Sequence, residues 1–255
     1  MNKLISFLRN LKAFFKTEND WNKKYTVYKR QLNDFKNLLG ANVKIIEYAC
    51  LSDNTEITPV EPHYTYHPAW AARVLAQIMP AKHIDISSTT NFGTIVSAFI
   101  PIEFYDYRPA NIHLSNYISG KADLTNLPFE SNSIESLSCM HTVEHIGLGR
   151  YGGPIDINGD IKAMKELERV VAVNGNLLFV VPIGTPRIEF NAHRIYDYET
   201  IIKAFSGLVL KEFSLIPDDF ENIGYIANPS IELINEQNWG CGCFWFTKLL
   251  SLIHI

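Results

Sequence analysis

Short apolar segments that end in polar or acidic residues alternate with helix-like segments through the middle of the chain. The predicted strands lie at 82–86, 102–106, 117–122, 134–140 and 176–181. Helices are predicted over 92–99 and 160–171, the second with apolar residues recurring every three or four positions. This alternation favours an α/β fold with a doubly wound, mostly parallel sheet. The carboxyl ends of strands in such a sheet line a ligand crevice.

Two more predicted strands, at 208–215 and 243–248, bring the sheet to seven. Asp197 is placed to begin a helix that runs to Phe205, before the first of these two strands. We expect residues 61–255 to form this α/β domain. Residues 1–60 would form an extension of helices with one strand over 43–50.

The extension begins with an amphipathic pattern over 3–16. It carries four basic residues without an intervening acid: Lys3, Arg9, Lys12 and Lys16. This pattern fits a helix lying on an anionic membrane, and it equally fits a helix that packs on the domain or on a partner. A second helix is predicted from an N-cap at Asp20 to a stop at Gly40. Its apolar stripe, expected to be core or interface, is Trp21, Tyr25, Tyr28, Leu32, Phe35 and Leu39.

Composition limits the class of protein. The formal net charge is −4 and 47% of the residues are hydrophobic, so the chain buries a core and shows no basic field for nucleic acid. Its four cysteines form no C-x-x-C pair, which favours a reduced, cytoplasmic protein. Cys241 and Cys243 face one side of a strand and are expected to be buried. No apolar run is long enough to span a bilayer, and no signal peptide is expected.

Three acids stand at successive strand ends. Asp106 follows Asp85 by 21 residues, the spacing at which dinucleotide-type folds place an acceptor for ribose hydroxyls. A carboxylate there forms charge-assisted hydrogen bonds to the sugar. Asp123, at the third strand end, would accept from an adenine amino group. The pattern therefore predicts a site for an adenosine-containing cofactor.

Residues 82–182 resemble the class I S-adenosylmethionine-dependent methyltransferases. The runs that carry this are Asp123-Leu-Thr-Asn-Leu-Pro-Phe129 and Glu166-Leu-Glu-Arg-Val-Val-Ala-Val-Asn-Gly-Asn-Leu-Leu-Phe179. Over about 60–215 the chain is similar to a narrower, methyltransferase-like family, domain of unknown function 268. Its marks are Glu144-His-Ile-Gly-Leu-Gly-Arg-Tyr-Gly-Gly-Pro-Ile-Asp156 and Asn191-Ala-His-Arg-Ile-Tyr196. Bacterial members of that family are often associated with surface-polysaccharide synthesis.

The resemblance implies a Rossmann-like methyltransferase fold and S-adenosyl-L-methionine as cofactor. Asp85 and Ser87 would border the methionine end, Asp106 would hold the ribose, and Asp123 with the backbone of Leu124 would hold adenine. Met140 and His141 would line the site after the fourth strand. The first loop departs from the superfamily, because Ser87, Thr89 and Asn91 occupy positions that normally carry glycine. Serine there would either bind the cofactor's carboxylate or narrow the pocket.

Several polar side chains are candidates for contact with a methyl acceptor. Glu144, His145 and His193 are candidate bases. Tyr151 and Arg194 would orient an anionic or sugar-like acceptor. Alternatively, Glu144 and His145 hold the glycine-rich loop 147–158, which would otherwise serve as a mobile lid. His63, Tyr64, Tyr66 and His67 cluster in a segment, 52–68, that is predicted to be a loop; they would contact a ligand or pack on the fold.

The run His141-x-x-Glu144-His145 also matches a zinc-peptidase pattern. It starts at a strand end and lacks an obvious third ligand, so we expect no metal there. The favoured function is methyl transfer to a small molecule or glycan precursor. The alternative is a binding or scaffold protein that keeps the fold without catalysis. The sequence does not define the oligomeric state.

Overall fold

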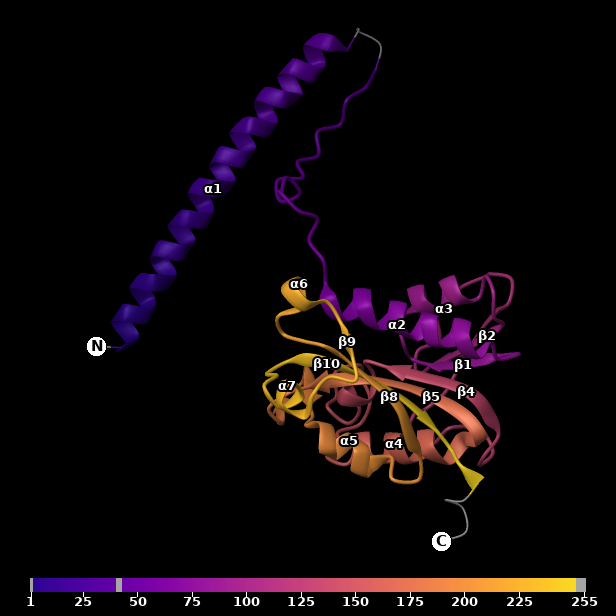
Figure 1. Cartoon of the computed structure of the whole chain (residues 1–255). Helices are drawn as coiled ribbons and strands as arrows, with labels where there is room; N and C mark the ends of the chain where they lie inside the picture. Colours follow the sequence, from indigo (N-terminus) through magenta and orange to yellow (C-terminus); the bar gives the residue numbers. More distant parts are fainter. Residues whose placement is uncertain (1, 40–42, 251–255) are drawn as a thin grey trace. The chain divides into compact units, whose positions relative to one another are not determined.

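The structure of the protein is a computed structural model that describes residues 2–39 and 43–250, with side chains from residue 19 onward (Figure 1). The chain divides into two units, Met1–Val60 and Glu61–Ile255. Each unit is described by itself.

The first unit consists of one long helix and an irregular segment. Helix α1 runs without a break over Asn2–Leu38, so the predicted start of a second helix at Asp20 is wrong. No glycine or proline interrupts residues 2–38, and a residue that favours an N-cap does not by itself stop a helix. The side chains of 3–16 and the predicted stop at Gly40 lie outside the description.

The strand predicted over 43–50 is also wrong. Residues 43–60 form neither helix nor strand. A β-strand needs a partner for its backbone hydrogen bonds, and within the described part of this unit the segment has none. It contacts α1 through Glu47, whose two carboxylate oxygens lie 3.0 Å from Lys29 Nζ and 2.9 Å from Lys36 Nζ.

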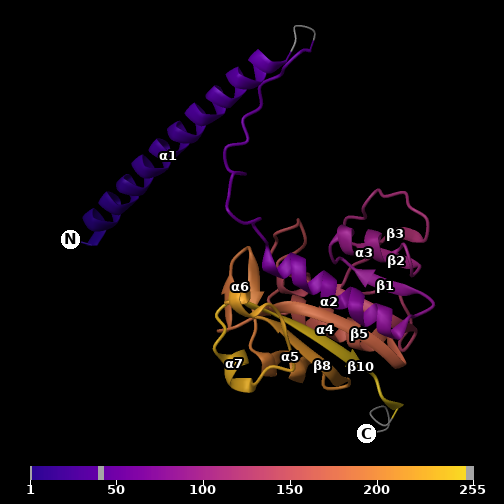
Figure 2. The ribbon, with the colours of Figure 1, turned by 45° about the horizontal axis from the view of Figure 1, so that its top comes forward.

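The second unit is built on one twisted sheet (Figure 2). The strand order is β3-β2-β1-β4-β5-β10-β8-β9. The strands are β1 His83–Ile86, β2 Ile102–Asp106, β3 Tyr117–Lys121, β4 Ile134–Met140, β5 Val171–Ile183, β8 Val209–Ile216, β9 Ile226–Ala227 and β10 Gly240–Thr247. β3, β2, β1, β4 and β5 are parallel, whereas β10 is antiparallel to β5 and β8. The predicted α/β fold with seven main strands is confirmed, and the two-residue β9 extends one edge.

Helices cover both faces of this sheet (Figure 1). α2 (Pro62–Ile78) and α3 (Thr90–Val96) pack on one face, while α4 (Gly159–Val170) and α5 (Tyr198–Ala204) pack on the other. The remaining elements are the 3₁₀ turn η1 (Val143–His145), the hairpin β6 (Arg187–Glu189) and β7 (His193–Ile195), α6 (Phe220–Ile223) and α7 (Ile231–Asn235). The buried apolar side chains therefore form one cluster on each face of the sheet.

Helix α2 begins earlier than the sequence predicts. Glu61 is its N-cap, with a side chain that accepts from the Tyr64 backbone N–H, and Pro62 stands in the first turn, where a missing N–H costs nothing. Pro68, the predicted start, lies inside the helix. His63 and His67 are therefore one helical turn apart, not on a loop.

The aromatic cluster beneath α5 gives a test of the core. Phe179 is fully buried, and its ring centroid lies 4.8 Å from that of Phe205. Phe179→Ala is expected to lower the free energy of unfolding by about 3–5 kcal/mol, because it removes a large apolar side chain and leaves a cavity. Urea denaturation measures this. Ile118→Ala, at a side chain 61% exposed on β3, is the control and should change stability by less than about 0.5 kcal/mol.

Candidate active site

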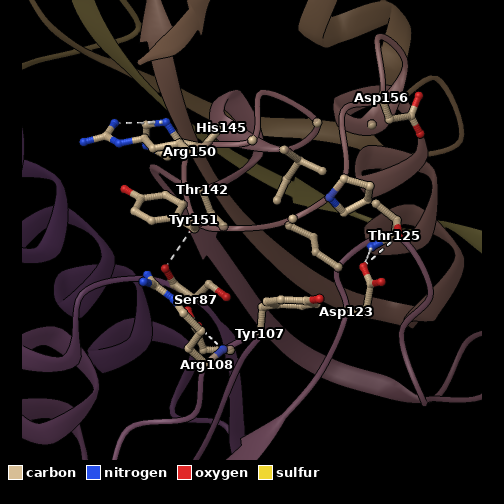
Figure 3. A pocket seen from close by; sticks show the side chains of 18 of the residues that line it. Ser87, Tyr107, Arg108, Asp123, Thr125, Thr142, His145, Arg150, Tyr151 and Asp156 are labelled. Atoms are coloured by element: carbon tan, nitrogen blue, oxygen red, sulfur yellow. Dashed lines mark hydrogen bonds between the residues drawn. The ribbon is translucent and has the colours of Figure 1, made fainter. Parts of the chain in front are cut away.

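A cavity of about 250 Å³ lies at the carboxyl ends of the parallel strands (Figure 3). Its walls come from the ends of β1, β2, β3 and β4 and from the segment 145–159. Seven of the residues predicted from the sequence line it: Ser87, Asp106, Asp123, Leu124, His141, His145 and Tyr151. Topology explains why they meet, since parallel strands deliver their following loops to one edge of the sheet.

Asp106 and Asp123 are each held by one carboxylate oxygen. Asp106 Oδ1 accepts from the Arg108 backbone N–H at 2.7 Å. Asp123 Oδ1 accepts from the backbone N–H of Thr125 at 2.9 Å and from its hydroxyl at 2.7 Å. Local turns thus orient both acids, and the second oxygen of each has no hydrogen bond to the described part of the protein. Both carboxylates are therefore preset acceptors at the cavity wall.

Ser87 adopts a backbone conformation that is more usual for glycine. Its φ is 57°, in the left-handed region that favours glycine. Its N–H donates to the Tyr105 carbonyl at 2.8 Å, and its own carbonyl accepts from the Thr142 hydroxyl at 2.8 Å. The loop after β1 therefore keeps a turn suited to glycine and is fastened to the end of β4.

Asp85 lies beneath the cavity and does not line it. The side chain is fully buried, where Oδ1 accepts from the Ser88 N–H at 3.0 Å and Oδ2 from the Ser138 hydroxyl. Ser88 Oγ in turn accepts from the Met140 N–H at 3.1 Å. Burial raises the pKa of Asp85 to about 6, against the opposing hydrogen bonds from the serines. This network joins the loop after β1 to β4, so Asp85 positions the cavity wall.

Glu144 lies fully buried between two imidazoles. Its Oε1 is 2.8 Å from His141 Nδ1 and 3.8 Å from His145 Nε2. Burial alone would raise the pKa of Glu144, but the hydrogen bond and charge of His141 hold it below the usual value. Glu144 therefore orients two histidines that face the cavity.

His145 has the arrangement of a base. Its Nδ1 donates to the Ala192 carbonyl at 2.6 Å, which leaves the lone pair on Nε2. Burial lowers the pKa of His145, so the neutral ring prevails near pH 7, and Glu144 would stabilise the protonated ring. Because His141 is at a strand end and only 143–145 is helical, the two histidines are not paired on a helix as the zinc-peptidase pattern requires.

The loop over the cavity is fixed by aromatic and basic contacts that the sequence did not reveal. The Tyr151 ring lies between two guanidinium groups, 4.6 Å from Arg108 Cζ and 5.1 Å from Arg150 Cζ. Arg108 follows β2, so this stacking closes the loop against the opposite wall (Figure 3). Gly147 has φ 81°, and a Cβ there would lie 1.9 Å from the Asp156 carbonyl oxygen, so the start of the loop requires glycine.

Three other predicted residues lie behind the cavity wall. Arg194 is buried and donates to the Ile146 carbonyl at 2.6 Å, so it supports the loop. His193 stacks on Trp239 with ring centroids 5.9 Å apart, and its ring is 6.4 Å from that of His145. Met140 is buried. Sequence reasoning found the residues at strand ends and missed Tyr107, Arg108, Thr125, Thr142, Arg150 and Asp156, which also line the cavity.

The raised pKa of Asp85 gives a pH test. A carboxyl whose pKa rises from 3.8 to about 6 on folding contributes stability below pH 4 that is lost as the pH rises through 6. Between pH 4 and 7 wild type should therefore lose about 2.5 kcal/mol relative to Asp85→Asn, which does not titrate. Urea denaturation at both pH values measures the difference. A difference between the two proteins that does not change with pH would show that folding leaves the pKa of Asp85 unshifted.

Comparisons with known proteins agree with this geometry. Residues 123–215 match the family model described as "Caenorhabditis protein of unknown function, DUF268". The matched segment contains Asp123, His141, Glu144, His145 and Tyr151. No curated protein matches the chain.

Three solved structures with a similar fold carry descriptions that name a methyltransferase. A chain of the complex between the Haloferax volcanii Trm112 methyltransferase activator and a methyltransferase is 16% identical, with a TM-score of 0.50 over 74% of this chain and 90% of that one. A structure described as a sarcosine dimethylglycine methyltransferase from Galdieria sulphuraria is 14% identical, with a TM-score of 0.50 over 71% and 85%. Geranyl diphosphate methyltransferase in complex with S-adenosylmethionine is 11% identical, with the same score and coverage. Residues 123–215 thus match the DUF268 family model, and they lie within a domain that has the same fold as these methyltransferase structures.

Proposed function

We propose that this protein is an S-adenosyl-L-methionine-dependent methyltransferase that acts on a small molecule or glycan precursor in the cytoplasm. The observation that carries the proposal is the pair of oriented carboxylates, Asp106 and Asp123, on the wall of one cavity with His145. Acids after β2 and β3 fit an adenosine, because a ribose and an adenine amino group both donate hydrogen bonds.

The residues around the cavity fit the cofactor. Asp106 would accept from the ribose hydroxyls through its free oxygen. Asp123 and the backbone of Leu124 would hold adenine. The left-handed backbone conformation of Ser87 would let the loop after β1 approach the methionine end of the cofactor closely. When bound, the cofactor supplies a methyl group on a positively charged sulfur.

The protein's own groups account for acceptor activation. His145 lines the cavity and carries its lone pair on Nε2, which would take a proton from an acceptor hydroxyl. Glu144 would stabilise the resulting imidazolium across 3.8 Å. The His193 ring lies 6.4 Å from the His145 ring and outside the cavity lining, so His145 is the favoured base.

The charge at the cavity mouth supports an anionic acceptor. Arg108 and Arg150 flank the Tyr151 ring, and all three line the cavity. A phosphate or carboxylate would pair with Arg108 and with the N–H groups of Arg150 that do not donate to the Ala192 carbonyl. Arg194 is buried and outside the cavity lining, and it donates to the Ile146 carbonyl. Sugar phosphates of surface-polysaccharide synthesis have this chemistry. The alternative, a scaffold without catalysis, corresponds to a cavity that binds no cofactor.

Binding of S-adenosylhomocysteine tests the proposal. Asp106→Ala removes up to two charge-assisted hydrogen bonds to the ribose, worth roughly 2–4 kcal/mol together. We therefore expect at least about tenfold weaker binding by calorimetric titration. Glu135→Ala, an exposed acid on β4 outside the cavity lining, is the matched control and should bind as wild type does.

Two results would count against these assignments. Wild type that binds nothing at millimolar ligand would favour the scaffold alternative. Equal affinity in Asp106→Ala and wild type would leave the fold's cofactor site intact but remove Asp106 from it.

We also propose that residues 3–16 contact an anionic membrane surface. In the described part of the chain no helix is both long and apolar enough to cross a bilayer. The segment does lie in a continuous helix, and its sequence combines an apolar stripe with four basic residues and no acid. A helix of this kind lies in the membrane interface.

Sedimentation with anionic vesicles at low salt tests the membrane contact. Each basic residue near such a surface contributes about 1 kcal/mol, so the double reversal Lys12→Glu/Lys16→Glu should weaken binding by at least about tenfold. The control Lys23→Glu/Lys24→Glu changes the same charge on the same helix outside 3–16. Equal loss in both variants would mean that net charge alone attracts the helix.

A further inference from the structure

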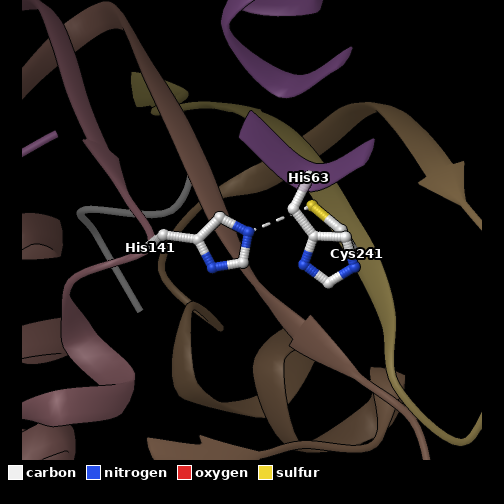
Figure 4. A group of neighbouring side chains, drawn as sticks. All are labelled: His63, His141 and Cys241. Atoms are coloured by element: carbon white, nitrogen blue, oxygen red, sulfur yellow. Dashed lines mark hydrogen bonds between the residues drawn. The ribbon is translucent and has the colours of Figure 1, made fainter. Parts of the chain in front are cut away.

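Two histidines and a cysteine from distant parts of the sequence meet behind the cavity (Figure 4). His63 lies in the first turn of α2, His141 follows β4, and Cys241 is in β10. One ligand atom from each lies within 4.8 Å of the other two. All three residues are buried, with exposed fractions of 5%, 9% and 0%.

We propose that these three residues bind a transition-metal ion, with Zn²⁺ as the best match. Imidazole nitrogen and thiolate sulfur are the ligands that structural zinc sites use. Cys241 Sγ lies 3.4 Å from His141 Nε2. Nitrogen and sulfur ligands on a tetrahedral zinc are about 3.5 Å apart, given the usual bond lengths. The pair is therefore spaced for one ion without rearrangement of the backbone.

The surroundings of His141 match those of a metal ligand. Its Nδ1 is 2.8 Å from Glu144 Oε1, so the carboxylate accepts the ring proton and leaves Nε2 free to coordinate. Histidines that bind metal usually donate their other N–H to a carboxylate or a carbonyl in this way. Glu144 thus fixes the orientation of the His141 ring and the tautomer in which Nε2 can coordinate a metal ion.

We assign His67 as the candidate fourth ligand; it lies outside the group whose ligand atoms are all within 4.8 Å of one another, so its ring would have to move toward the ion. It follows His63 by one helical turn, and its ring centroid is 5.0 Å from that of His141. Its Nδ1 donates to the His63 carbonyl at 2.6 Å, so the lone pair is on Nε2. That nitrogen is fully buried and has no hydrogen-bond partner among the described residues. An unpaired buried acceptor is costly, and a bound cation would remove the cost.

The same contacts contain another arrangement, in which Cys241, His141 and Glu144 act as nucleophile, base and orienting acid. The Cys241 thiol is fully buried, so a substrate has no path to it in this structure. This arrangement also leaves His63 and His67 without a role. The metal site accounts for all the side chains, and it stands independently of the proposed methyl transfer.

Titration of the metal-free full-length protein with Co²⁺ provides the test. Cobalt replaces zinc in tetrahedral sites and reports a thiolate ligand by a near-ultraviolet charge-transfer band. We expect one equivalent to bind with this band, and competing Zn²⁺ to abolish it. The thermal midpoint should rise with Zn²⁺ and fall again with a chelator, because the ion binds only the folded state. Wild type that shows no cobalt uptake would overturn the proposal without the need for any variant.

Variants then assign the ligands. Cys241→Ser should lose the charge-transfer band, whereas Cys243→Ser, two residues along the same strand and outside the cluster, should keep it. Glu144→Gln should keep the band and weaken binding roughly 10- to 100-fold. His67→Gln should also weaken binding with the band retained; unchanged affinity there would overturn the fourth ligand.

Retention of the band in Cys241→Ser would overturn the assignment of the site. An alkylating reagent that modifies Cys241 faster than Cys243 in a wild type without cobalt uptake would instead support the nucleophile arrangement. S-adenosylhomocysteine binding, measured in parallel on metal-free protein, separates failure of this proposal from failure of the proposed function.

Discussion

The buried carboxylate of Glu144 organises the polar side of this domain. An ionised acid without water is unfavourable unless charged or polar partners surround it, and Glu144 has an imidazole at 2.8 Å and a second at 3.8 Å. Its backbone carbonyl accepts from buried Arg194. Burial of the ionised Glu144 therefore depends on both His141 and His145, and Arg194 of β7 holds its backbone. The loop 147–158 follows directly after this group of residues.

The topology of the sheet explains how so many polar groups reach one place. β4 and β5 run parallel, so the turn after β4 lies at the edge where the loops of β1 and β2 also emerge. β10 runs in the opposite direction beside β5, and its first residues therefore arrive at the same edge. A parallel strand in that position would have placed Cys241 at the far edge. The reversed direction of β10 brings Cys241 to His141.

The sequence was informative where one local pattern decides the structure. The bounds of β2 and β4 were predicted residue for residue, because a polar segment follows each strand, beginning after Asp106 and after Met140. The sequence was misleading where contacts with distant segments determine the local structure. Residues 43–50 have strand-like composition but no partner strand among the residues that the structure describes, and Asp20 resembles a cap in a helix that continues through it. The meeting of His63 with Cys241 depends on the crossing of α2 over β10, which no local pattern encodes.

His141 has a strained backbone conformation that its side-chain contacts maintain. Its φ is 53°, a conformation that costs a residue with a Cβ roughly 1 kcal/mol or more and costs glycine nothing. Glycine at this position would relieve the strain, but it would remove the partner of Glu144 and the neighbour of Cys241. The conformation persists because the His141 N–H is held by the Val180 carbonyl at 2.9 Å while both ring nitrogens have partners. The imidazole therefore joins the cavity wall to the buried cluster, and any ion bound in that cluster would act directly on a residue that lines the cavity.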